Sequence, residues 1–213
     1  MRIDRGPDPG PFSKHADYKP HLQGPFRSRC AYCLTHDSRF GGLDCMEVDH
    51  FKPVSRYPEL RLAWSNLYYS CRPCNSFYKK DHPTPAEESQ GCRLVDPCNE
   101  DPDKHFRMVR DPATGSLCRI EALTPAAEFT VRTLRFNSRK MLRDYWREIE
   151  DHEGEVTARI QQIDVLLGDL ERRVQREGSS AEIVSVRNDF LEQRRTCFDK
   201  VRNLRAMRPF PAE

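Results

Sequence analysis

The chain has 213 residues, of which 37% are hydrophobic and 32% charged, and its formal net charge is +2. That length accommodates one sizeable domain or a small domain with an appendage. The low apolar content indicates long exposed helices, and the small net charge excludes a protein that is basic over its whole surface. No apolar run reaches the roughly 18–20 residues of a membrane span, and the N-terminus lacks the apolar core of a signal peptide. We therefore expect a cytoplasmic protein without a membrane partner.

Residues 1–24 are rich in proline and glycine, with Pro7, Pro9, Pro11 and Pro20 as the prolines. This composition resists helix and sheet, so we predict an extended N-terminal arm. Three apolar side chains are available to hold the arm against the body: Phe12, Tyr18 and Leu22.

Four of the nine cysteines form two CxxC pairs, Cys30 with Cys33 and Cys71 with Cys74. In a reducing compartment, metal ligation explains paired cysteines better than disulfides do. The spacing suits a tetrahedral four-thiolate zinc site, which closes all coordination positions and is therefore structural. Four unliganded core cysteines are the alternative, but they leave the spacing unexplained. The other five are predicted to be small buried hydrophobes: Cys45, Cys92, Cys98, Cys118 and Cys197.

The insert between the two pairs is predicted to contain short secondary structure. Residues 46–50 alternate apolar and polar side chains as a strand does, and residues 67–69 form a second short strand. A helix is expected over residues 74–80, because Pro83 and Pro85 follow it. The predicted order is strand, strand, helix.

Residues 92–123 are predicted to contain a β-hairpin, with strands at 106–110 and 117–123 and a turn at 111–115. The remainder is predicted to be helical. Thr124 is a suitable N-cap with Pro125 in the first turn, and one apolar face then runs over several turns. That face consists of Val131, Leu134, Met141, Leu142, Tyr145 and Ile149.

A heptad seam continues this helical region through Val156, Ile160, Ile163, Leu167, Leu170 and Val174. A turn is expected at residues 178–180, where Ser179 and Glu182 form a capping-box pattern for a last helix. In that helix a second seam runs through Ile183, Val186, Phe190, Cys197, Val201 and Leu204. The two seams predict either an antiparallel helical hairpin or a surface for homo-oligomerisation.

The order of motifs across about a quarter of the chain resembles the HNH endonuclease family. The matching residues are Cys30 and Cys33, then VDHFKP at residues 48–53, then Asn66-Leu67, then CRPCN at residues 71–75 and Lys79-Lys80. The resemblance implies a ββα-metal fold around one catalytic divalent cation. It also implies that Asn66 orients the catalytic histidine and that Asn75 completes the metal site.

Phosphodiester hydrolysis requires residue types that this motif supplies. His50 has the intrinsic basicity of a general base near neutral pH. Asp49 can anchor the metal on the other side of the strand, because neighbouring strand residues point in opposite directions. Asn75 stands where the pattern that names the family has histidine, and its hard amide oxygen favours Mg²⁺ or Mn²⁺. His82 lies seven residues further on, and a histidine in a surface loop is the better interpretation of it.

Basic side chains near the motif are candidates for contact with nucleic acid. Lys52, Lys79 and Lys80 can bind phosphates with salt-sensitive affinity and no sequence preference, or they can form a solvated charged surface. Four arginines recur at steps of three and four beyond Thr124: Arg132, Arg135, Arg139 and Arg143. They can line a groove for nucleic acid or, together with nearby glutamates, form a self-compensating helix surface.

We therefore predict an α+β protein in which a zinc-stapled ββα-metal core carries a small β-hairpin and a C-terminal helical region. The expected divisions are an arm at 1–24, a nuclease domain at 25–123 and a helical domain for docking or dimerisation at 124–213. Beyond the motif, Tyr57-Pro58, Val95-Asp96-Pro97 and LRFN at residues 134–137 follow in an order that is similar to the small HNH nucleases of Septu-type and retron-linked anti-phage systems. This more diffuse resemblance implies an ATPase partner. The predicted function is DNA cleavage; a non-catalytic zinc module and an RNA-directed nuclease are the alternatives.

Overall fold

The computed structural model describes residues 2–78 and 83–210. The chain separates into two compact units. Unit 1 comprises Met1–Asp144 together with Pro209–Glu213, and unit 2 comprises Tyr145–Arg208. The boundary that we expected at residue 124 therefore falls inside unit 1, so that the first part of the predicted helical region belongs with the strands.

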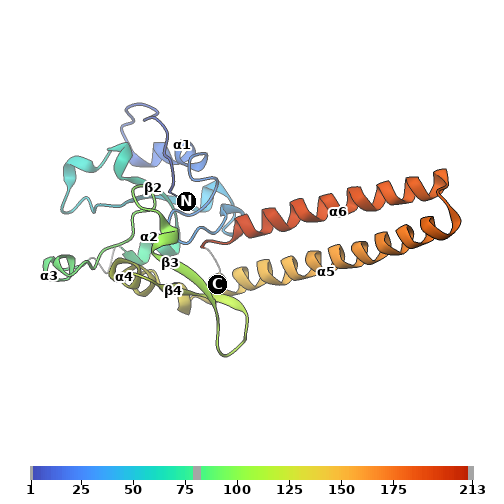
Figure 1. Cartoon of the computed structure of the whole chain (residues 1–213). Coiled ribbons are helices and arrows are strands. Elements are labelled where there is room, and N and C mark those ends of the chain that lie inside the picture. Colours follow the sequence, from blue (N-terminus) through green and yellow to red (C-terminus); the bar gives the residue numbers. More distant parts are fainter. Residues whose placement is uncertain (1, 79–82, 211–213) are drawn as a thin grey trace. The chain divides into compact units, whose positions relative to one another are not determined.

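The centre of unit 1 is a two-stranded antiparallel sheet followed by a helix (Figure 1). Strand β1 (Met46–His50) pairs with β2 (Leu67–Cys71), with Asp49 opposite Tyr68. Helix α2 (Arg72–Tyr78) follows β2 without a loop. Every residue of β2 is buried, because both faces of this small sheet are covered. The predicted order of strand, strand and helix is confirmed.

The N-terminal arm is partly helical instead of extended throughout. It contains a 3-10 helix at His15–Tyr18 and helix α1 (Lys19–Gln23). Pro20, which argued against a helix, lies in the first turn of α1, where the missing amide proton has no helical partner to lose. Tyr18 and Leu22 are buried, so these apolar side chains do hold the arm against the body. Arg5 adds a hydrogen bond to the Trp64 carbonyl.

The second sheet of unit 1 is the predicted hairpin. Strand β3 (Phe106–Arg110) pairs with β4 (Leu117–Ala122) in antiparallel register. Helix α4 (Pro125–Thr133) follows, and the Thr124 hydroxyl accepts from the Ala127 amide as the predicted N-cap. Phe210 returns to this unit, with its ring centroid 4.6 Å from that of Phe106.

The apolar face that we predicted as one helix from residue 124 is interrupted. Arg135 adopts a left-handed conformation with φ of 54°, which ends α4, and a 3-10 turn at Phe136–Ser138 separates it from helix α5 (Lys140–Glu177). Met141, expected on that face, is 40% exposed. Neither glycine nor proline marks the break, so periodicity alone could not reveal it. The remaining short elements of unit 1 are α3 (Pro85–Ser89) and 3-10 turns at Asp37–Arg39, Leu43–Cys45, Pro58–Leu60, Trp64–Asn66 and Pro102–Lys104.

Unit 2 is an antiparallel helical hairpin formed by α5 and α6 (Ala181–Met207), which lie side by side in Figure 1. Its core cluster consists of Val156, Ile160, Val201 and Leu204. Arg194 on α6 also donates to Asp164 on α5 at 2.6 Å. The predicted hairpin is confirmed, although Ser180, and not Ser179, caps α6 by accepting from the Ile183 amide. Among the described residues, no helix combines the length and the apolarity that crossing a membrane requires.

Candidate metal centre and active site

The two CxxC pairs meet in a single buried cluster. The Sγ atoms of Cys30, Cys33, Cys71 and Cys74 all lie within 4.8 Å of one another, and the Sγ atoms of Cys33 and Cys71 are 3.9 Å apart. Four zinc–sulfur bonds of about 2.3 Å in a tetrahedron separate the sulfurs by about 3.8 Å. A metal such as zinc therefore fits this cluster in size and in donor type.

Local backbone geometry explains how the first pair converges. The Leu34 amide donates to the Cys30 carbonyl at 2.9 Å, and the Cys30 amide donates to the Thr35 carbonyl at 3.0 Å. Leu34 adopts the left-handed conformation with φ of 54°, which closes a tight turn after the second thiol. The second pair spans the junction of β2 and α2, so the sheet and the helix fix its position.

Arg139 is a partner of the cluster that sequence reasoning missed. Its Nη1 lies 3.1 Å from the Cys74 Sγ and its Nη2 3.8 Å from the Cys71 Sγ. Burial of the guanidinium opposes its charge, but the negative charge of the cysteine cluster outweighs this effect and raises the pKa of Arg139. The pKa of Cys33 lies well below its ordinary value, because hydrogen bonds from the other three cysteines outweigh the effect of burial. The pKa of Cys71 is raised by hydrogen bonds with other cysteines and by burial, and the pKa of Cys74 is raised by burial and by hydrogen bonds of the same kind. The cluster is thus partly anionic, with the Arg139 guanidinium against it.

Asp49 and Asn75 are both buried beside this cluster, in the ββα segment. Asp49 is 1% exposed and accepts a hydrogen bond of 2.6 Å from the Tyr32 hydroxyl. The Asn75 amide nitrogen donates to Glu47 at 2.5 Å, and Glu47 lies two residues before Asp49 on the same face of β1. The Asn75 Oδ1 is buried and has no hydrogen-bond partner among the residues that the structure describes. An orphaned amide oxygen on a side chain that contacts the Glu47 carboxylate fits a hard divalent cation.

The four cysteines are the one group, among residues 2–78 and 83–210, in which three or more His, Cys, Asp or Glu side chains lie close enough to share a metal. A cation at Asp49 and Asn75 would therefore have few protein ligands. This is the usual situation of Mg²⁺, which keeps several waters and binds through one or two side chains plus the substrate phosphate.

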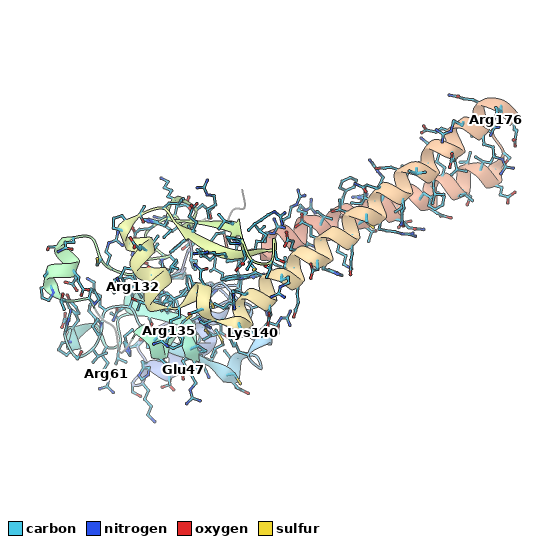
Figure 2. The ribbon with its side chains drawn as sticks, turned by 90° about the horizontal axis from the view of Figure 1, so that it is seen from below. Glu47, Arg61, Arg132, Arg135, Lys140 and Arg176 are labelled. Atoms are coloured by element: carbon cyan, nitrogen blue, oxygen red, sulfur yellow. The ribbon has the colours of Figure 1, made fainter. Side chains whose placement is uncertain are left out.

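His50 points to the opposite side of β1 from Asp49, as expected for neighbours on a strand. Its Nε2 lies 2.9 Å from the Arg61 carbonyl oxygen, and Arg61 is labelled in Figure 2. A carbonyl only accepts, so Nε2 carries the proton, and in the neutral ring Nδ1 is the nitrogen with the free lone pair. The His15 ring lies 4.9 Å from the His50 ring, a neighbour that the sequence did not indicate.

Asn66 acts on the loop around His50 through main-chain groups. Its Oδ1 accepts from the Lys52 amide at 2.7 Å, and its Nδ2 donates to the carbonyls of Lys52 and Leu60 at 3.0 and 3.2 Å. Leu60 precedes Arg61, whose carbonyl holds His50. A side chain that is 4% exposed thus connects the residues after β1 to the loop that fixes the imidazole.

The predicted lysine contacts are described only in part. The Lys52 ammonium lies 5.4 Å from the centroid of the Tyr57 ring, a distance at which a cation is attracted to an aromatic face. Lys79 and Lys80, together with His82, lie outside the described residues.

Comparison with known proteins agrees with this geometry. Residues 30–81 match the HNH endonuclease family. The HNH segment, as we name residues 30–81, contains both CxxC pairs as well as Asp49, His50, Asn66 and Asn75. The chain is also similar to the Septu protein PtuB of Bacillus thuringiensis, with 33% identity over 84 residues. That match covers 38% of this chain and 28% of the relative. No solved structure gives a significant match.

The comparisons confirm the resemblance that the motifs indicated, and the fold class of a strand-and-helix HNH segment with a four-cysteine site is confirmed as well. Sequence reasoning overlooked Tyr32 and Glu47. Both carried a signal, since Tyr32 lies between Cys30 and Cys33, and Glu47 shares the face of Asp49 by strand alternation. Arg139 carried none, because it lies 65 residues from its cysteine partner.

Proposed function

We propose that this chain is a metal-dependent endonuclease that hydrolyses phosphodiester bonds in DNA. One observation carries the proposal. The Arg61 carbonyl binds Nε2 of His50, so that Nδ1 is left as a basic nitrogen, and His50 directly follows the buried Asp49 in an HNH segment. This is the pairing of base and metal ligand that phosphodiester hydrolysis requires.

His50 accepts the proton of the attacking water at Nδ1. An imidazole is suited to this because it changes protonation near neutral pH. Asn66 is a positioning residue: by clamping Lys52 and Leu60 it holds the Arg61 carbonyl in place, and that carbonyl fixes the ring and its tautomer. A general base typically accelerates a reaction by about 10²–10⁴-fold.

Asp49 and Asn75 would hold the catalytic cation, Mg²⁺ or Mn²⁺, which when bound would supply positive charge to the scissile phosphate and the leaving oxygen. The Tyr32 hydroxyl orients Asp49, and Glu47 orients the Asn75 amide so that its oxygen is available as a ligand. The four cysteines would hold zinc as a structural ion, and Arg139 would offset part of the thiolate charge.

Lys52, Lys79 and Lys80 contact phosphates of the bound DNA. The similarity to a Septu protein supports a role in defence against phage, beside an ATPase partner. The hairpin of unit 2 is then the surface for that partner or for a second copy of the chain.

The proposal is tested by plasmid nicking with the zinc-loaded full chain in Mg²⁺ or Mn²⁺. We expect EDTA to stop the reaction and His50→Ala to lower the rate at least about 100-fold, with zinc content and circular dichroism unchanged. His152→Ala is the matched control, because His152 is a histidine of α5 that pairs only locally, with Glu155. Undiminished nicking by His50→Ala would contradict the mechanism.

Two further experiments distinguish a DNA nuclease from an RNA nuclease and from a non-catalytic zinc module. A labelled single-stranded RNA, cut while plasmid DNA stays intact, would assign the activity to RNA. Zinc binding and nucleic-acid binding without cleavage, in the presence of the products of neighbouring genes as well, would favour the non-catalytic zinc module. Including those gene products keeps a nuclease that is silent without its partner from being mistaken for a binding module.

A further inference from the structure

A groove outside the HNH segment has the chemistry of a phosphate-binding site. It lies between β4, α4 and the 3-10 turn that follows α4, and it has a volume of about 500 Å³. We name it the arginine groove, because four of its polar lining residues are arginines; the polar lining consists of Asp111, Arg119, Arg132, Arg135, Asn137, Ser138 and Arg143. We propose that the arginine groove binds the phosphodiester backbone of the nucleic-acid substrate next to the active site. The inference rests on the proposed function for the identity of its ligand.

The charges in the groove are largely uncompensated. Arg119, Arg132 and Arg135 are exposed, and none of them forms an ion pair with a carboxylate among the residues described. Arg143 lies 3.9 Å from Asp111, which is the one acidic residue in the lining. Elsewhere in unit 1, Arg107 pairs with Glu121 and Arg93 with Glu100. Three arginines without an ion pair among the described residues therefore line one groove.

An adjoining cavity of about 410 Å³ extends the same surface along the hairpin. It shares Arg119, Val131, Arg132 and Asn137 with the arginine groove and adds Arg110. Its carboxylates are Glu121, which pairs with Arg107, and Glu128. The two cavities share part of their lining, and together they contain five arginines, Arg110, Arg119, Arg132, Arg135 and Arg143, against three carboxylates. A surface with several cations suits a strand of nucleic acid, which presents several phosphates.

The fold holds this surface with a strained turn. Arg135 has φ of 54°, a conformation that costs a residue with a side chain roughly 1–2 kcal/mol. Asn137 fixes the turn, because its side chain exchanges two hydrogen bonds of 2.8 Å with the main chain of Ile120 on β4. The Asn137 amide is thus occupied by the backbone and is not available to a base edge, so we expect affinity without sequence preference.

Arg135 also connects the groove to the HNH segment. Its guanidinium lies 4.7 Å from the centroid of the Phe77 ring on α2, and Phe77 is two residues beyond Asn75. Figure 2 shows Arg132 and Arg135 along α4 and the turn after it. A strand whose scissile phosphate lies near Asn75 therefore has basic side chains to follow from α2 onto the hairpin. Guanidinium groups suit such phosphates because they donate in a planar fork.

The test measures binding separately from cleavage. A fluorescein-labelled 20-base-pair duplex is titrated with the zinc-loaded full chain in Ca²⁺, and anisotropy is followed from 50 to 300 mM salt. We expect Arg119→Ala/Arg132→Ala to weaken binding at least about tenfold at 100 mM salt. The slope of log affinity against log salt should become shallower by about 2, because two phosphate contacts are lost.

Arg173→Ala/Arg202→Ala is the matched control, since it removes two exposed arginines of unit 2 that pair with Glu177 and Asp199. It should leave the affinity and the slope within twofold of wild type. Arg119→Lys/Arg132→Lys should restore most of the slope, because the charge is kept. Equal affinity and slope in the alanine variant and the wild type would overturn the proposal.

Chemical protection of the wild-type chain provides a result that does not depend on how a variant folds. The arginine reagent p-hydroxyphenylglyoxal is used, and the modified residues are mapped by mass spectrometry. Adding the duplex should decrease modification at Arg119, Arg132 and Arg135. Inorganic pyrophosphate at equal ionic strength should protect these residues less. Unchanged modification with duplex bound would contradict the inference, and equal protection by pyrophosphate would assign the groove to a free phosphate compound.

The two proposals can fail separately. If His50→Ala loses nicking but Arg119→Ala/Arg132→Ala binds the duplex like the wild type, only the arginine groove is refuted. If binding depends on the groove but the wild type cuts no nucleic acid, only the nuclease activity is refuted.

Discussion

The two units of this chain are stabilised in different ways. Unit 1 has two sheets of two strands each and several short helices, and its interior contains buried polar side chains such as Asp37, Asp49, Asn66 and Asn75. Unit 2 is a hairpin of two long helices with a narrow apolar seam. An isolated two-stranded sheet is marginally stable at best, so the sheets of unit 1 depend on the groups that pack around them or hold them together. The comparison indicates that the cysteine cluster stabilises unit 1 as the seam stabilises unit 2.

The largest expected effect comes from removing the metal. Structural zinc contributes folding free energy on the order of 10 kcal/mol in small domains, so Cys71→Ser, or a chelator with a reductant, should unfold the HNH segment. The seam of unit 2 contains no part of the cluster, so its helices should persist. Limited trypsin digestion with mass spectrometry should then find cleavage sites opened in residues 25–123 and few new ones in α5 and α6.

Cys45→Ser is the matched control for this prediction, because Cys45 is exposed and is not part of the cluster. It should retain zinc and resist digestion as the wild type does. If Cys71→Ser left the HNH segment protected, the cluster would not be what stabilises unit 1.

A smaller loss in the free energy of unfolding is expected from a substitution in the apolar seam of unit 2. Ile160→Ala removes a side chain that is 7% exposed and packs in the core cluster of unit 2, and such truncations cost about 2–5 kcal/mol. Leu166→Ala, at a side chain that is 40% exposed, should cost much less. Urea unfolding followed by far-ultraviolet circular dichroism measures both. A loss of zinc in Ile160→Ala would contradict the separation of the two units.

The smallest expected effect is a dependence of the stability of unit 1 on pH. Burial raises the pKa of Cys98 to about 11, although Arg5 opposes the shift. A thiol in the unfolded chain ionises near pH 8.5, so the unfolded state loses its proton first and stability falls as the pH rises from about 8.5 toward 11. At pH 10 the decrease is about 1–2 kcal/mol. Urea unfolding between pH 8 and 10 should show it in the wild type, and Cys98→Ala should flatten the curve. An equal decrease in that variant would exclude Cys98 as the cause.

Local sequence patterns predicted much of unit 1 correctly, because residues close together in the sequence determine the structure there. The alternation over Met46–His50 matches β1, and the CxxC spacing located four ligands that the fold brings together. The break at Arg135 could not be predicted in the same way. Its left-handed conformation is held by tertiary contacts, chiefly the two bonds from Asn137 to Ile120, and the apolar pattern continues across it.

The candidate site also combines features that local patterns predict with features that depend on long-range contacts. The cysteines, Asp49, His50 and Asn75 could be named from a motif. Two of the contacts that hold them could not, because they come from elsewhere in the chain: the Arg61 carbonyl binds His50, and Arg139 binds Cys74. The arginine groove also depends on the break after α4, because an uninterrupted helix would not bring Asn137 to β4. Sequence patterns named the candidate site residues, and long-range packing determines how they are held.

The central claim is that the thiolate cluster and the oxygen site bind different metals for different purposes. Electron paramagnetic resonance titration of the zinc-loaded full chain with Mn²⁺ tests it most directly, in wild type and in Asn75→Ala, with Asn75→Asp as the variant that keeps an oxygen ligand. We predict one zinc per chain in all three proteins, and Mn²⁺ affinity at least about tenfold weaker in Asn75→Ala alone. Equal Mn²⁺ affinity in Asn75→Ala and wild type, or loss of zinc from Asn75→Ala, would contradict the account.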